Sequence, residues 1–401
     1  MAGRPDRMAR MPDQPPLSLY VHLPWCVRKC PYCDFNSHKA GDAPPRARYV
    51  DALLADLRRE KACGRDAGRT IDTVFIGGGT PSLFSAAEIA TVLQAIDDSF
   101  PLASDAEITM EANPGTIERG DPLGYRRAGV NRLSLGAQSF DAGILQALGR
   151  IHGPDEIVAA FEGAVAAGFD NINIDLMFAL PGQDLAAAKR DIKQAIALAP
   201  QHISYYQLTL EPNTVFARRP PIDLPDAENS WDIQEAGQQL LVDAGYRQYE
   251  VSAFAQQHRR CRHNLNYWQF GDYLAIGAGA HGKYTDMSGA VWRYWKPLHP
   301  LSYIEAAEAG ALDDNQRKQS PADVSFEFML NHLRLSQGFT PALFEQRTGQ
   351  SIDRIRAPLE RARADGLLRQ VGMEWQVTEF GQRFLNDLQA RFLLEDMVAD
   401  G

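Results

Sequence analysis

Six short apolar runs alternate with segments of helical periodicity between residue 17 and about residue 244 of the 401-residue chain. The runs have the length and composition of strands, and apolar residues recur at helical spacing in the segments between them. The predicted strands are Ser18–His22, Thr73–Ile76, Glu107–Met110, Arg132–Leu135, Asn171–Leu176 and His202–Leu208. The predicted helices are Arg46–Cys63, Ala86–Ser99, Pro122–Ala128, Asp155–Ala167, Leu185–Leu198 and Asn229–Ala244. This alternation predicts an α/β fold built on a parallel sheet.

Each predicted strand is followed by a polar or glycine-rich loop. In chain order the loops are LPWCVRKCPYCDFNS, GGGTPS, EANPGT, GAQSF, FALPGQ and LEPNT. The carboxyl ends of parallel strands meet at one edge of the sheet, and that edge is where such folds carry their chemistry. The six loops therefore predict one shared active-site face.

The pattern changes to mainly helical stretches beyond about residue 301. Helices are predicted at Ala322–Ser336, Pro341–Thr348 and Ile352–Asp365, followed by a two-strand hairpin and a closing helix. Helices followed by a small hairpin suggest a winged-helix-like module. We expect a disordered leader over residues 1–16, a barrel domain with a connecting segment over 17–300, and a smaller C-terminal domain over 301–401.

Net charge and hydrophobicity exclude several classes of protein. The formal charge of −10 argues against a nucleic-acid surface, which needs a basic face. No segment is apolar enough for a signal peptide or a membrane span, so a cytoplasmic protein is expected. Peripheral contact with a membrane is compatible with this sequence.

Three of the five cysteines, Cys26, Cys30 and Cys33, lie within eight residues of one another. This spacing suits neither a disulfide framework nor the paired motifs of most zinc sites. Three thiolates can hold a four-iron, four-sulfur cube and leave one iron without a protein ligand. The alternatives are three unrelated thiols, or a zinc ion whose fourth ligand is His22 or His38.

A glycine-rich loop follows the second predicted strand. Gly78, Gly79 and Thr80 belong to it, and adjacent glycines allow a ligand to approach the backbone closely. A tight turn between strand and helix would explain the same glycines.

The cysteine loop after the first strand resembles that of the radical-SAM superfamily. The motifs CVRKCPYCDF, GGGTPS, EANPGT, NRLSLGAQSF, LMFALPGQ and HNLNYW are similar to those of oxygen-independent coproporphyrinogen III oxidase (coproporphyrinogen dehydrogenase) and its relatives, over nearly the whole chain. The resemblance implies a partial (β/α)6 TIM-like barrel with a smaller C-terminal domain, a [4Fe–4S] cluster on the three cysteines, and S-adenosylmethionine (SAM) at the open iron. By the same resemblance, the residues that contact SAM are Tyr20, Tyr32, Gly78, Gly79, Thr80, Glu111, Gln138, Arg150 and Asp175.

Two departures separate this chain from the oxidases. Phe35 stands where their cysteine motif continues with a fourth cysteine, and the first strand begins after only about sixteen residues. Both features resemble the HemW-type heme chaperones. That resemblance implies a protein that binds the cluster, SAM and heme and transfers heme to an acceptor protein, and a homodimer is compatible with it. The alternative is the oxidase itself, which decarboxylates coproporphyrinogen III oxidatively with SAM, and the sequence leaves open whether SAM is cleaved.

The motif HNLNYW supplies the expected heme contacts, His263, Asn264, Tyr267 and Trp268. A histidine can ligate heme iron, and aromatic rings can border a porphyrin. The alternative is a packed aromatic cluster around a hydrogen-bonded histidine, and nearby Cys261 is a rival iron ligand. His281 and His152 lie in loops that could also face the pocket, where histidines are commonly structural.

Overall fold

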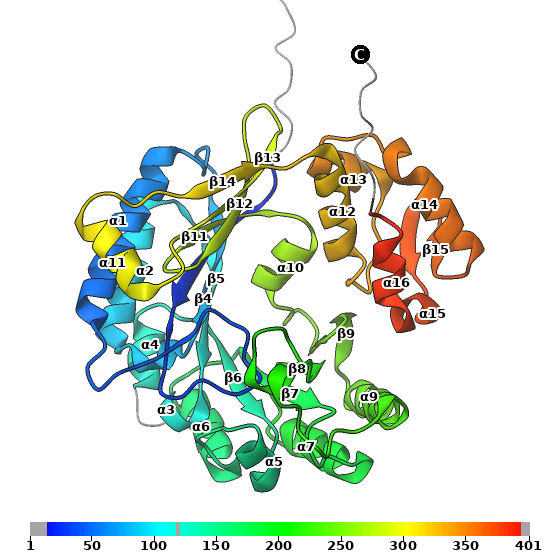
Figure 1. Ribbon diagram of the computed structural model, residues 1–401, viewed down its shortest axis with the longest axis horizontal. Helices are drawn as coiled ribbons and strands as arrows, with labels where there is room; N and C mark the ends of the chain where they lie inside the picture. Colours follow the sequence, from blue (N-terminus) through cyan, green and yellow to red (C-terminus); the bar gives the residue numbers. More distant parts are fainter. Residues whose placement is uncertain (1–13, 118–120, 394–401) are drawn as a thin grey trace, which may run out of the picture.

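The computed structural model describes residues 14–117 and 121–393. All six predicted strands are present, and they pair in parallel in chain order. They are β1 (Leu17–Leu23), β4 (Ile71–Gly78), β5 (Leu102–Ala112), β6 (Arg132–Gln138), β7 (Ile172–Phe178) and β8 (His202–Gln207). The predicted α/β class, with a parallel partial barrel and a smaller helical C-terminal part, is confirmed (Figure 1). Residues 1–13 of the predicted disordered leader lie outside the described residues.

Helices cover the outer face of this sheet (Figure 1). The six predicted ones are α1 (Arg46–Cys63), α2 (Ala86–Ser99), α4 (Pro122–Arg127), α6 (Pro154–Ala166), α7 (Leu185–Ala197) and α9 (Ala227–Asp243). Between them lie the short elements η1 (Pro81–Leu83), α3 (Pro114–Ile117), α5 (Ala142–Ala147) and α8 (Val215–Arg218). Alternate residues of β1, including Leu19 and Val21, are buried in the main core, so the polar residues between them face the barrel interior.

The sheet continues at both ends beyond the six predicted strands, with strands that we did not predict. Next to β1 lie β11 (Asp272–Ile276), β12 (His281–Thr285), β13 (Val291–Trp295) and β14 (Asn315–Lys318). Next to β8 lie β10 (Ala253–Ala255) and β9 (Arg247–Glu250). Only β11 is parallel to its neighbour β1, and the other added strands are antiparallel to theirs. The free edges of β14 and β9 leave the barrel open in the described part of the chain.

A short helix occupies the inner side of the open barrel. Helix α10 (Arg262–Trp268) carries most of the HNLNYW motif and packs against β4, β1 and β11. The ring of His263 on this helix contacts the ring of Phe75 on β4, with the two ring centroids 5.0 Å apart. The motif therefore packs inside the barrel and is not a surface loop.

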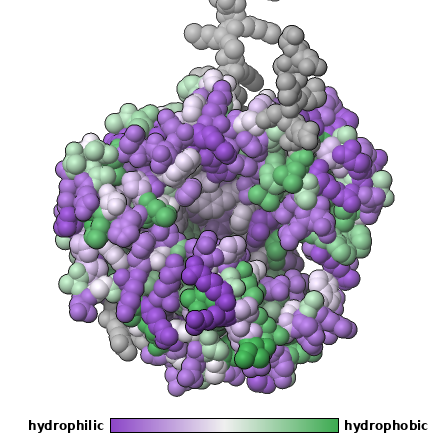
Figure 2. All heavy atoms as spheres, in the orientation of Figure 1, coloured by the Kyte–Doolittle hydropathy of each residue, from purple (hydrophilic) through white to green (hydrophobic). Residues whose placement is uncertain are grey.

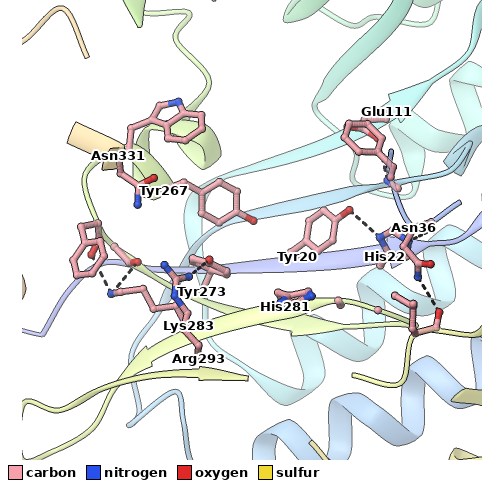
Figure 3. A pocket seen from close by; sticks show the side chains of 18 residues that line it. Tyr20, His22, Asn36, Glu111, Tyr267, Tyr273, His281, Lys283, Arg293 and Asn331 are labelled. Atoms are coloured by element: carbon pink, nitrogen blue, oxygen red, sulfur yellow. Dashed lines mark hydrogen bonds between the residues drawn. The ribbon is translucent and has the colours of Figure 1, made fainter. Parts of the chain in front are cut away.

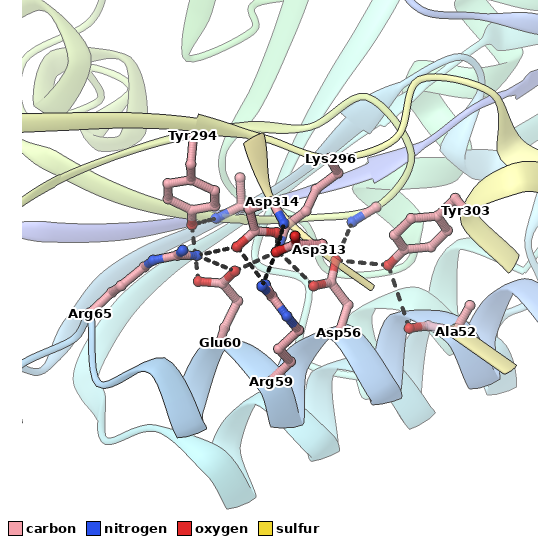
Figure 4. A network of polar contacts seen from close by, with 12 residues as sticks. Ala52, Asp56, Arg59, Glu60, Arg65, Tyr294, Lys296, Tyr303, Asp313 and Asp314 are labelled. Carbon is pink, nitrogen blue, oxygen red and sulfur yellow. Dashed lines mark hydrogen bonds and ion pairs between the residues drawn. The ribbon is translucent and has the colours of Figure 1, made fainter. Parts of the chain in front are cut away.

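A buried ionic network fixes the added strands to α1 (Figure 4). Lys296, directly after β13, lies 2.7 Å from Asp56, 2.5 Å from Glu60 and 2.9 Å from Asp314, measured from its Nζ. Arg65 contacts Glu60 and Asp314 as well. Buried charges are tolerated when they are paired in this way, so the network ties α1, β13 and β14 together.

The C-terminal part has a hydrophobic cluster of its own. It contains α12 (Pro321–His332), α13 (Pro341–Thr348), α14 (Asp353–Ala364), the hairpin β15 (Leu368–Val371) and β16 (Glu374–Val377), α15 (Glu379–Arg383) and α16 (Leu385–Ala390). The predicted single closing helix is two short helices, because the backbone of Phe384 leaves the helical region.

The chain remains with the barrel for some distance past residue 300. Helix α11 (Pro300–Glu308) packs on α1, and β14 pairs with β13. We propose that the second domain begins near residue 319, where the second hydrophobic cluster takes over. In addition, no helix in the described ranges is both long and apolar enough to cross a lipid bilayer.

Replacing Lys296 by methionine tests the ionic network. The variant leaves three buried carboxylates with less compensating charge, so we expect a loss of about 3–5 kcal/mol in the free energy of unfolding, measured by urea denaturation. The control Arg48→Ala removes an exposed ion pair between Arg48 of α1 and Glu308 of α11, and it should leave the denaturation midpoint nearly unchanged. Equal midpoints for the Lys296 variant and wild type would contradict this role.

Candidate functional site

The cysteine loop begins directly after β1 and is closed at its base. Cys26 ends the short strand β2 (Trp25–Cys26), which pairs with β3 (His38–Lys39). The backbone N–H of Ala40 donates to the carbonyl of Cys26 over 2.8 Å, and that of Cys33 donates to the carbonyl of Cys30 over 3.1 Å. These bonds hold the loop compact at the carboxyl edge of the parallel strands.

All three thiols of the motif line one cavity in the barrel mouth. This cysteine cavity has a volume of about 470 Å³ and extends over the inner ends of β4 to β8. It also contains eight of the nine residues expected to contact SAM, namely Tyr32, Gly78, Gly79, Thr80, Glu111, Gln138, Arg150 and Asp175. Tyr20 is the exception, because it faces a neighbouring cavity.

The thiols do not converge on a single point. Among the described residues, no three His, Cys, Asp or Glu side chains are arranged to hold one metal ion. A zinc site needs such convergence, whereas each cysteine of a cluster binds a different iron. Neither His22 nor His38 lines the cysteine cavity, so neither is placed to complete a zinc site. The donor set fits a cluster better than a single ion.

The glycine loop packs tightly against the cysteine loop. The N–H groups of Gly79 and Thr80 donate to the carbonyls of Leu23 and Trp25, over 2.7 and 2.8 Å. A Cβ on Gly79 would lie 2.6 Å from the carbonyl oxygen of Trp25, and Gly78 has a φ of +119°. Close packing of two loops therefore requires these glycines, and the same loop forms one wall of the cavity.

Two half-buried carboxylates, Glu111 and Asp175, face this cavity. The N–H of Gly78 donates to Glu111 over 3.0 Å, and Asn173 and Ser134 donate to Asp175 over 2.8 and 3.0 Å. Burial, with a smaller contribution from the charge of Asp175, raises the pKa of Glu111 to about 7. Burial also raises the pKa of Asp175. Glu111 can thus exchange a proton near neutral pH.

Arg150 brings positive charge to the cysteines. Its Nη1 lies 3.7 Å from the sulfur of Cys30, and its Nη2 donates to the carbonyl of Gly136 over 2.7 Å. Its buried Nε has no partner in the described structure. A buried unpaired donor of this kind is matched to an anionic or polar ligand group. Gln138, in left-handed backbone conformation, accepts a 2.8 Å bond from Tyr206 beside it.

The sequence analysis missed several polar residues of the cavity. Arg132, Ser134, Asn173 and Ser204 lie on β6, β7 and β8 at positions that face inward. Arg132 is almost fully buried, and its Nε also lacks a partner. The available signal was polar residues at alternate positions of otherwise apolar strands, which marks the inner face of a barrel.

A second cavity of about 560 Å³ adjoins the first (Figure 3). Its walls are largely aromatic, and we call it the aromatic cavity. Tyr267 and Trp268 from α10 line it, together with Tyr20 and Tyr273. Figure 2 shows the same face of the molecule hollowed near its centre, with mainly hydrophilic residues around the rim.

The two cavities share a wall. Phe35, Gly78 and Glu111 line both of them, and Phe35 is 60% exposed. Next to Phe35, the carbonyl of Asn36 bonds Nε2 of His22 over 2.8 Å, and Nδ1 of His22 bonds the Tyr20 hydroxyl over 3.0 Å. The end of the cysteine loop therefore connects directly to the aromatic cavity.

His263 and Cys261 face neither cavity. His263 is fully buried, with Nδ1 bonded to Thr73 and Nε2 to Tyr267, both over 2.8 Å. Burial lowers the pKa of His263 to about 3. Cys261 is fully buried against Glu107. Of the expected heme contacts, the structure thus brings Tyr267 and Trp268 to the aromatic cavity and Asn264 to the cysteine cavity, but not His263.

Comparison with known proteins agrees with this arrangement. The model of the radical SAM superfamily matches residues 20–195, and that of the HemN C-terminal domain matches residues 319–392. The protein named heme chaperone HemW from Escherichia coli (strain K12) is 50% identical over 381 residues, 95% of this chain and 99% of that protein. The chain belongs to the HemW family. HemW of Haemophilus influenzae (strain ATCC 51907 / DSM 11121 / KW20 / Rd) is 47% identical over 96% of this chain and its own full length. HemW of Bacillus subtilis (strain 168) is 31% identical over 94% of this chain and 99% of its own.

A solved structure extends the similarity beyond HemW proteins. Coproporphyrinogen III oxidase (HemN) from Escherichia coli, described as a radical SAM enzyme, superposes with a TM-score of 0.79 at 25% sequence identity. The match covers 96% of this chain and 91% of the oxidase. The two families therefore share the complete two-part scaffold.

The raised pKa of Glu111 predicts a pH dependence of stability. The ordinary pKa of a glutamate is 4.5, and that of Glu111 in the folded protein is about 7. Between these two pH values the folded state binds more protons than the unfolded chain, so the contribution of Glu111 to stability falls as pH rises. Between pH 4.5 and 8, the free energy of unfolding of the wild type should fall by roughly 3 kcal/mol more than that of Glu111→Gln. Urea denaturation at both pH values measures this difference, and parallel pH profiles would contradict it.

Proposed function

We propose that this chain is a heme chaperone, which holds a [4Fe–4S] cluster and SAM in the cysteine cavity and heme in the aromatic cavity, and transfers heme to an acceptor protein. The observation that carries the proposal is the pair of adjoining cavities, one lined by three thiols and the other by aromatic rings. The names of relatives at 50% and 47% identity support it. We also propose a cytoplasmic location, with which the five free cysteines are compatible. The homodimer stays a prediction.

Cys26, Cys30 and Cys33 are the proposed cluster ligands. Burial raises the pKa of the Cys26 thiol, so this cysteine would become a thiolate only as iron binds. The guanidinium of Arg150, beside the Cys30 sulfur, would offset part of the negative charge of a cluster held there. When bound and reduced, the cluster supplies one electron at a time. The unpaired donors of Arg150 and Arg132 are suited to the carboxylate and ribose of SAM.

The competing function is oxidative decarboxylation of coproporphyrinogen III. The scaffold similarity to the oxidase supports this alternative. Against it stands Phe35, which puts an exposed aromatic ring, and no thiol, on the wall between the two cavities. An apolar flat ring suits a border for a porphyrin. We therefore prefer heme handling.

Replacing Cys30 by serine tests the cluster ligands. After anaerobic reconstitution, wild type should contain about four irons per chain, and Cys30→Ser should lose most of them. Cys63→Ser is the matched control, because Cys63 is an exposed residue at the end of α1 and lines neither cavity. Full iron content in the Cys30 variant would reject the assignment.

Heme titration of reconstituted wild-type protein separates the two functions. A chaperone should shift the Soret band of added hemin at about one heme per chain. In an anaerobic assay with SAM, a reductant and coproporphyrinogen III, it should form no vinyl product. Absence of any Soret shift would reject heme binding, and vinyl product formed together with 5′-deoxyadenosine would establish the oxidase instead.

A further inference from the structure

The aromatic cavity contains few groups able to bind iron through nitrogen or sulfur. Its lining has no cysteine or methionine, and its only nitrogen bases are two histidines and a lysine, namely His22, His281 and Lys283. Its volume of about 560 Å³ lies within the range of roughly 300–1,000 Å³ that small-molecule sites occupy. A heme held here would need its axial ligand from this short list.

Two of these three bases are already engaged. His22 uses both ring nitrogens, one toward Tyr20 and the other toward Asn36. Lys283 is buried and donates to Asp272 over 2.8 Å, with two further bonds to the carbonyls of Phe270 and Gly271. Binding of iron by either group would break buried hydrogen bonds, which is costly.

The tyrosines of the cavity are poor alternatives. Tyr20, Tyr267 and Tyr273 are hydrogen-bonded to His22, His263 and Arg293 in turn. Burial raises the pKa of all three phenols, so the phenolate form that binds iron is disfavoured. His263, expected from the motif, is sealed behind Tyr267.

His281 differs from these groups because its ring nitrogens are free. It is the first residue of β12, it is exposed, and neither ring nitrogen has a hydrogen bond in the described structure. Its ring stacks on Trp295 of the neighbouring strand, with centroids 6.2 Å apart and planes 22° apart. Figure 3 shows the ring beside the same space as Tyr20 and Tyr267. The imidazole is therefore oriented by packing while its nitrogens stay available.

The protonation state of His281 also suits a metal ligand. Partial desolvation of the ring at the cavity wall, together with the nearby Arg293, lowers the pKa of His281, which favours the neutral imidazole that ligates metals. Lys283 follows two residues later on the same face of β12, and Arg293 pairs with Lys283 across the strands. Both of these cations are already paired, Lys283 with Asp272 and Arg293 with Glu327, so the neutral imidazole is the group here that remains open to a ligand.

We propose that His281 is the residue of this chain that ligates the iron of heme in the aromatic cavity. His263 then has a positioning role, holding Tyr267 toward the cavity from behind. This inference rests on the proposed function, because it takes heme to be the occupant of the cavity.

Hemin titration of three full-length reconstituted proteins tests the proposal. They are wild type, His281→Ala and the control His258→Asn, in which an exposed histidine outside both cavity linings is changed. We expect His281→Ala to raise the Kd for hemin by at least about tenfold and to replace the histidine-ligated absorption and EPR spectra. Added imidazole should restore those spectra in His281→Ala, and the control should match wild type.

The outcomes distinguish this inference from the function on which it rests. Wild-type spectra in His281→Ala would overturn the ligand assignment and leave heme binding standing. No heme binding by wild type would overturn both. Circular dichroism and iron content of His281→Ala should match wild type, since His281 is exposed and unbonded. His263→Gln provides a second comparison, and unaltered heme spectra in that variant support the proposal, whereas loss of the histidine-ligated spectrum in His263→Gln alone overturns it.

Discussion

Backbone hydrogen bonding on both sides of β1 is the constraint on which the functional face depends. One side of β1 pairs with β4, in register from Ser18 opposite Thr73 to Leu23 opposite Gly78. The other side pairs with β11, which is some 250 residues distant in the chain. The cysteine loop leaves the end of this doubly paired strand, so it emerges between the six-unit sheet and the added strands. Both cavities form around that point.

The two cavities are physically coupled through a small set of residues. Phe35 and Glu111 belong to both walls, and Asn36 anchors the end of the cysteine loop to the carbonyls of Ala278 and Leu298. Hydrogen bonds thus tie the end of the cysteine loop directly to the segment that precedes β12. Tyr20 and His22 continue the same hydrogen-bonded chain along β1. The proposed cluster and heme sites would respond to each other through these contacts.

The position of the added strands depends on the buried ionic network. Leu274 and Ile276 of β11 are buried in the main core, whereas β12, β13 and β14 contribute no residue to that core in the described part of the chain. Lys296 and its carboxylate partners hold β13 and β14 on α1. Arg293 and His281 lie on the same ribbon of strands, and the network thereby fixes the side of the aromatic cavity that faces α10. The same ionic network therefore contributes both to stability and to the geometry of the aromatic cavity.

The sequence by itself determined the six parallel units, the cysteine loop and most of the cysteine cavity. Strand and helix periodicities are local, and parallel pairing sends every following loop to one edge. The resemblance of the motifs to a known family then singled out Glu111, Gln138 and Asp175. Only the tertiary structure decided the second cavity, because the pairing of β11 with β1 is a long-range choice that no local pattern encodes. For the same reason, the HNLNYW motif could not reveal that its histidine is sealed behind Tyr267. Nor could a loop motif reveal that His281, stacked on Trp295, keeps both ring nitrogens free at the cavity wall.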